Sequence, residues 1–113
     1  ERPIAAIAST DFTHYGSSFG FTPEGVGPSA HEWMRRNDRR LIDLALELKA
    51  EEIVPEARSR QSACGAGALA AAVAYARSRG AREGALLERT DSHEVRGAGE
   101  PFTMAVGYAG IVW

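Results

Sequence analysis

The stretch Thr103-Met104-Ala105-Val106-Gly107-Tyr108-Ala109-Gly110-Ile111-Val112-Trp113 is apolar or small at nearly every position. Successive side chains of an extended segment point to opposite faces, so this run presents apolar groups on both. Strands that are covered on both faces, as in the interior of an α/β sheet, have this composition. We therefore predict a long central strand over residues 103–113, buried on both sides.

Residues 4–9 and 85–89 predict two further strands, the first a short apolar run typical of an interior strand. Helices are predicted between them. Asn37 or Asp38 can cap an amphipathic helix, a second helix covers residues 51–60, and an alanine-rich third runs from about residue 62 to Arg79. Strands separated by helices place the chain in the α/β class, as a single unit over residues 1–113.

Composition excludes several classes of function. The 113 residues carry a net charge of -2, so nucleic acid is not an expected partner. No apolar run is long enough to span a bilayer, so no membrane association is expected. Cys64 is the single cysteine, which excludes an internal disulfide and indicates a reducing, cytoplasmic location.

Asp11 and His14 are the first candidate site residues. They lie three residues apart, just past the predicted strand at residues 4–9, and ligand sites in α/β sheets gather at that end of a strand. A carboxylate and an imidazole are sound ligands for a divalent transition metal, or the carboxylate can orient the imidazole. The alternative interpretation is structural: Asp11 caps a turn and His14 is a loop residue.

Cys64 is the second candidate, placed with Gly65 at the start of the alanine-rich helix. Unpaired N–H groups and the positive end of the helix dipole favour a thiolate there. Alternatively, Cys64 is a small buried hydrophobic residue. His93 follows the predicted strand at residues 85–89 and is either a ligand or part of a solvated loop over residues 93–101. His31 is expected at the surface.

Three segments resemble the Memo family, whose bacterial members are called AmmeMemoRadiSam system protein B. They occur in the family's order: Ser9-Thr10-Asp11-Phe12-Thr13-His14-Tyr15-Gly16 followed by Phe19-Gly20-Phe21, then Ser62-Ala63-Cys64-Gly65, then Ala105-Val106-Gly107-Tyr108-Ala109-Gly110. The resemblance implies a three-layer α/β/α fold with a largely buried mixed sheet, similar to class III extradiol dioxygenases. It also implies an iron or copper site in which His14 and Cys64 are catalytic and metal-ligating residues, with Asp11 beside them.

One segment departs from the family pattern. Thr90-Asp91-Ser92-His93 stands where the family usually has Thr-Ser-Gly-Asp. His93 is therefore either a substitute ligand or irrelevant to the site. The family's other histidine ligands lie in an N-terminal half that does not match this chain, so the resemblance predicts an incomplete metal site.

These observations leave three functional hypotheses. The first is a metal-binding redox protein of the dioxygenase-like class, in which a cysteine ligand favours redox cycling over ring cleavage. The second is a non-catalytic module that binds a peptide or small molecule in the same cleft. The third, a cysteine hydrolase, requires Cys64 and His14 within hydrogen-bond reach.

The expected partner is the N-terminal half of the same protein. The chain opens on Glu1 and leads directly into the predicted strand at residues 4–9, so we expect a portion of a longer protein. An unpaired apolar sheet edge is an association site, so the portion alone is expected to form a homo-oligomer, to hold little metal and to be inactive.

Overall fold

The fold is organised around strand β3 (Ala105–Val112), in a computed structural model that describes residues 3–97 and 99–113. β3 is the middle strand of a three-stranded sheet of order β1-β3-β2 within these residues. β1 (His14–Tyr15) and β2 (Ala85–Asp91) both pair with β3 in antiparallel orientation. The prediction of a central strand is confirmed, whereas the pairings among the described residues are all antiparallel and not mixed.

Side chains of β3 alternate between a covered and an open face. Ala105 and Gly107 are buried, and Ile111 packs against the main core. The intervening Tyr108 and Val112 are 40% and 48% exposed. The prediction that this strand is covered on both sides is therefore wrong for the described residues, because their helices cover one face only.

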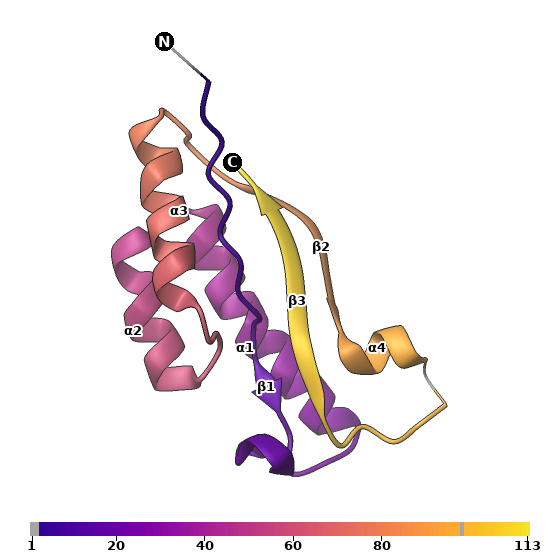
Figure 1. Cartoon of the computed structure of the whole chain (residues 1–113). Coiled ribbons are helices and arrows are strands. Elements are labelled where there is room, and N and C mark those ends of the chain that lie inside the picture. The colour runs from indigo at the N-terminus through magenta and orange to yellow at the C-terminus, as the bar shows by residue number, and fades with distance from the viewer. Residues whose placement is uncertain (1–2, 98) are drawn as a thin grey trace.

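One helix, α1 (Pro28–Leu46), packs directly against β2 and β3, while α2 (Ala50–Arg60) and α3 (Ala66–Ser78) pack against α1 and against each other. Figure 1 shows α1 behind the sheet and α2 and α3 to one side of it. The helices meet each other and the sheet in an apolar core that includes Leu41, Ile42, Ala45, Ile53, Ala57, Leu69 and Val73. The described residues thus form a small α/β unit, with helices packed beside a three-stranded antiparallel sheet.

α1 begins earlier than the sequence indicates. Gly27 adopts φ 95° and Pro28 occupies the first turn, a favourable start because proline has no N–H to leave unpaired. Asn37 and Asp38 therefore lie in the middle of α1, where both are buried, and the prediction that one of them caps a helix is wrong. In α2, Pro55 lies within the helix, five residues after its first residue Ala50.

Residues 4–9 form no strand, which corrects the prediction of an interior strand there. Ile4 and Ile7 are 75% and 93% exposed. Ladder-like contact with β3 begins only at Phe12, whose N–H donates to the carbonyl of Gly107 over 2.9 Å. The preceding segment runs along the edge of a groove of about 690 Å³ lined also by α3 and the end of β3. The apolar side chains of this segment predicted that it is buried, but the described residues do not cover it.

A fourth helix, α4 (Ser92–Arg96), begins where a loop was predicted. Asp91 caps it, because its side chain accepts a hydrogen bond from the backbone N–H of Glu94 over 2.9 Å. At the start of α3, by contrast, Cys64 lies outside the helix and Gly65 is the residue that precedes its first turn. Among the described residues, no helix combines the length and apolarity needed to cross a membrane.

Candidate metal centre

Asp11, His14 and Cys64 come together in space, as the sequence predicts. One ligand atom of each lies within 4.8 Å of the others. His14 Nε2 is 3.4 Å from Asp11 Oδ2. His14 belongs to β1, and Cys64 lies in the turn between α2 and α3, so residues 50 positions apart in the sequence meet only through the fold.

Thr10 holds the two segments together. Its hydroxyl donates to the carbonyl of Asp11 over 2.8 Å and accepts from the backbone N–H of Gly65 over 2.7 Å. Cys64 Sγ lies 3.7 Å from the same hydroxyl oxygen. A side chain at Gly65 would bring its Cβ within 2.9 Å of Thr10, so glycine is required for this close approach.

The centre is open to solvent. The side chains of His14 and Asp11 are 31% and 47% exposed, and Cys64 is exposed. The His14 ring packs on Phe19, with the ring centroids 5.0 Å apart. Within the described residues, the hydrogen bond of Cys64 is to Thr10 and not to His14, so the contact that a cysteine hydrolase requires is not made.

A second group of possible ligands comprises His31, Asp91 and His93, with ligand atoms again within 4.8 Å of one another. His31 Nε2 is 2.7 Å from Asp91 Oδ2. His31 is only 7% exposed, so the expectation that it lies at the surface is wrong. The helical spacing of α1 explains the burial, because His31, Met34, Asp38 and Leu41 share its inward face.

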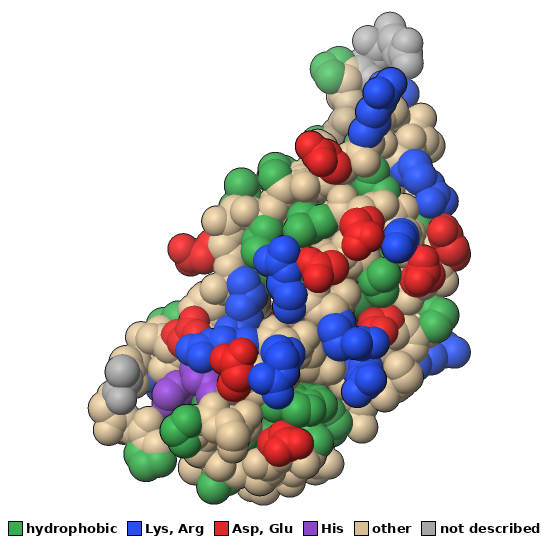
Figure 2. Space-filling view, turned by 180° about the vertical axis from the view of Figure 1, so that it is seen from behind, with side chains coloured by type: hydrophobic (Ala, Val, Ile, Leu, Met, Phe, Trp, Pro, Cys, Tyr) green, Lys and Arg blue, Asp and Glu red, His purple; other side chains and the backbone are tan. Residues whose placement is uncertain are grey.

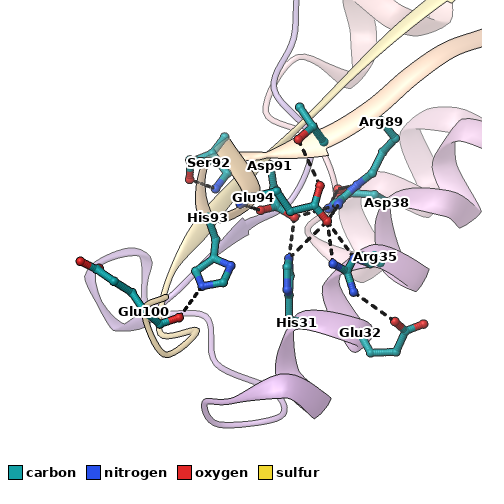
Figure 3. Close-up of polar contacts among 12 residues, drawn as sticks. His31, Glu32, Arg35, Asp38, Arg89, Asp91, Ser92, His93, Glu94 and Glu100 are labelled. Atoms are coloured by element: carbon teal, nitrogen blue, oxygen red, sulfur yellow. Dashed lines mark hydrogen bonds and ion pairs between the residues drawn. The ribbon is translucent and has the colours of Figure 1, made fainter. Parts of the chain in front are cut away.

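Asp91 and Asp38 are linked by Arg89, an inward-facing residue of β2 (Figure 3). The Arg89 guanidinium donates to Asp38 Oδ2 over 2.7 Å and to Asp91 Oδ2 over 2.8 Å. Asp38 Oδ1 also accepts the backbone N–H of Thr13 over 2.9 Å. This network connects α1, β2 and the segment that leads to His14.

The surroundings shift the pKa values of Asp38 and Asp91 in opposite directions. Burial raises the pKa of Asp38 above its ordinary value, although hydrogen bonds from Thr13 and Arg89 oppose the rise. Burial also acts to raise the pKa of Asp91, but hydrogen bonds outweigh it and leave the pKa below its ordinary value. The donors to Asp91 are the backbone N–H of Glu94, His31 and Arg89.

Comparison with protein families and relatives identifies the chain. The family model described as Memo-like protein matches residues 1–112. The chain belongs to the Memo family. A MEMO1 family protein of Pyrococcus abyssi is 38% identical over 116 residues, which cover 98% of this chain and 38% of that protein. Relatives with the same family name from Thermococcus kodakarensis and Methanopyrus kandleri are 36% and 34% identical, over 99% and 100% of this chain.

The chain spans about 38% of the length of the first two of these relatives, so it matches a portion of a Memo protein. No solved structure matches it. The Memo resemblance predicted the meeting of Asp11, His14 and Cys64 but gave no role to Thr10 or His31. A helix extended back to Pro28 would have placed His31 inward, and the Gly27-Pro28 pair was the available signal.

Proposed function

We propose that Asp11, His14 and Cys64 are the part of a redox-active metal centre that this portion of a Memo protein contributes. The supporting observation is the meeting of a carboxylate, an imidazole and a thiol with ligand atoms within 4.8 Å. The proposed activity of the whole protein is that of a dioxygenase-like oxidoreductase. His14 and Cys64 are the proposed principal ligands, and Asp11 either completes the set or orients His14.

The chemistry of these donors fits iron or copper. A thiolate is a soft ligand that favours copper and iron, and imidazole suits both. A bound ion would supply one-electron chemistry next to a solvent-accessible position. Cys64 is exposed and itself oxidisable, which suits redox cycling better than ring cleavage. Thr10 would preserve the site geometry by fixing the Asp11 segment against Gly65.

The centre is proposed to be completed by the rest of a full-length Memo chain. Three protein groups leave coordination positions free, and about 38% of the relatives' length is represented here. The open face of β3, with Tyr108 and Val112 exposed, is the surface that the remainder would cover. That cover would complete the three-layer α/β/α architecture that the family resemblance implies.

The first test measures iron and copper in the full-length protein after reconstitution. Cys64→Ser and His14→Ala should each lower metal affinity by more than about tenfold, because each removes a ligand. Gly65→Ala should also lower it, because the added methyl group must displace Thr10, which holds the Asp11 segment. Elemental analysis and electron paramagnetic resonance on the same samples provide the measurement.

Gly67→Ala is the matched control. It adds the same methyl group two residues further on, in α3, where nothing lies within 4 Å. Its metal content should equal that of the wild type. Metal uptake that is insensitive to Cys64→Ser and His14→Ala would refute the centre. Metal-free protein that still bound a peptide or small molecule would instead support a binding module on the same fold.

The open face also predicts the behaviour of the 113-residue chain by itself. Large apolar side chains on or near the sheet are more than a third exposed: Leu87, Tyr108, Val112 and Trp113. Exposed apolar surface of this kind drives association. We expect the chain alone to self-associate, in a dimer or larger assembly, and to carry less metal than the full-length protein. Light scattering that reports a monomer with one tightly bound iron or copper ion would contradict both expectations.

A further inference from the structure

We propose that His31, Asp91 and His93 form a second metal site, which binds a divalent transition metal such as Zn²⁺ and is separate from the Cys64 centre. The two sites lie on opposite sides of β3. His14 pairs with Val106 on one edge of that strand, and Asp91 pairs with the adjacent Gly107 on the other edge. The second site draws its ligands from α1, the end of β2 and α4.

The hydrogen bond of His93 leaves its other ring nitrogen available as a metal ligand. Its Nε2 lies 2.9 Å from the backbone carbonyl of Glu100, and a carbonyl oxygen can only accept, so Nε2 carries the hydrogen. In the neutral ring, Nδ1 then has a free lone pair. This Nδ1 is buried and has no hydrogen-bond partner among the described residues. Metal-bound histidines typically have this arrangement, with one nitrogen donating to a carbonyl and the other facing the ion.

His31 and Asp91 provide the other two donors from a buried setting (Figure 3). Their side chains are 9% and 0% exposed, and His31 Nε2 donates to Asp91 Oδ2 over 2.7 Å. An ion bound between them would replace this hydrogen, so the neutral His31 ring would bind through Nε2 and carry its hydrogen on Nδ1. Ligands of a tetrahedral zinc ion lie about 3.4 Å apart, so this pair must separate slightly and the third donor must move inward. Phe102 stacks on the His31 ring with centroids 4.5 Å apart, which keeps the imidazole in its present plane.

The surrounding charges favour a cation. Two guanidinium groups and four carboxylates are joined by the contacts drawn in Figure 3: Arg35, Arg89, Glu32, Asp38, Asp91 and Glu94. Arg36 also contacts Glu32, so three positive and four negative charges leave one negative charge, and the surroundings favour a cation over an anion. Figure 2 shows histidine side chains at the surface beside basic and acidic groups.

The donor set indicates the kind of ion. Two imidazoles and one carboxylate suit Zn²⁺ or Fe²⁺, whereas the absence of sulfur from the set gives Cu(I) no preferred ligand. Mg²⁺ prefers oxygen ligands and should bind poorly. A bound ion would tie α1 to the junction of β2 and α4. It would thereby support β3, whose other edge pairs with β1 and so with His14.

The test is a calorimetric zinc titration of the chain after alkylation of the exposed Cys64 with iodoacetamide. Alkylation blocks the thiolate of the first centre, so the remaining strong site should bind one Zn²⁺ per chain. His93→Phe keeps an aromatic ring against His31 and Phe102 but removes the ligand nitrogen. It should weaken zinc binding by more than about tenfold and abolish the zinc-induced rise in melting temperature.

His14→Phe, made in the same alkylated background, is the control and should leave this zinc binding unchanged. Circular dichroism shows whether each variant folds. Either of two results would overturn the proposal: no zinc uptake by the alkylated wild type, or equal uptake by the folded His93→Phe chain. A failure of the proposed Cys64 centre can be distinguished from a failure of this site. In that case Cys64→Ser would leave iron or copper binding unchanged, while His93→Phe would still weaken zinc binding.

Discussion

Replacing Asp38 by alanine is expected to lower the free energy of unfolding by about 3–5 kcal/mol, as is usual when one partner of a buried ion pair is removed. Asp38 is fully buried in α1 and accepts from Arg89 and from the backbone N–H of Thr13. Burial raises its pKa, so the carboxylate itself is costly to keep ionised. The predicted loss therefore comes from the groups left behind, a nearly buried guanidinium and an unpaired N–H.

That origin can be tested with a double-mutant cycle. Arg89→Met removes the guanidinium, so the double variant Asp38→Ala/Arg89→Met should lose less stability than the sum of the two single variants. Asp43→Ala is the control on the same helix, because Asp43 pairs with Arg39 at the surface and should cost less than about 0.5 kcal/mol. Urea denaturation provides the measurement. An Asp38→Ala loss no larger than that of Asp43→Ala would contradict the role of the network.

Gly107→Ala is expected to destabilise the fold by about 3 kcal/mol, at the upper end of what an added methyl group costs in a packed core. A Cβ at Gly107 would overlap Asp38 Oδ2, and its backbone N–H already donates to the carbonyl of Thr13 over 2.9 Å. The methyl group must therefore displace a buried carboxylate or shift β3 away from α1. Either movement disturbs the segment that carries His14.

Gly110→Ala is the matched control in the same strand. The nearest atom to its added Cβ is Leu87 Cβ at 3.8 Å, an ordinary contact on the open face of the sheet. It should change stability little. Thermal melts of both variants, followed by metal binding on the folded fraction, distinguish the two positions. Equal melting temperatures for Gly107→Ala and Gly110→Ala would show that α1 does not pack as closely on β3 as the structure has it.

The sequence predicted the positions of those helices and strands that are specified by residues within the segment itself. α2 over Ala50–Arg60 and the strands β2 and β3 follow the predicted positions to within a few residues. The prediction of an interior strand at residues 4–9 was wrong. An apolar sequence indicates that a segment is buried, but it does not indicate which part of the protein covers it. The start of α1 was missed because Asn37 and Asp38 are usual capping residues, and their burial depends on partners far away in the sequence.

The first candidate centre was predicted, the second was not. Asp11 and His14 lie in one short motif, and the family resemblance linked them to Cys64. His31 and Asp91 are 60 positions apart, and no motif links them. His93 was named as a possible ligand from its position after a predicted strand, with a solvated loop as the alternative. Its buried, unpartnered Nδ1 is visible only once Glu100 and Phe102 are in place around it.

The sequence by itself determined the α/β class, the central place of β3 and which side chains can act as ligands, because periodicity and donor chemistry are properties of single segments. Tertiary structure alone decided on which face of the sheet the helices of the described residues lie. It also decided that Thr10 fixes the Cys64 turn, and that a histidine of α1 meets Asp91. Those outcomes depend on packing and hydrogen bonds between segments that are distant in the sequence. Such contacts stabilise the protein only when the chain folds and brings the segments together.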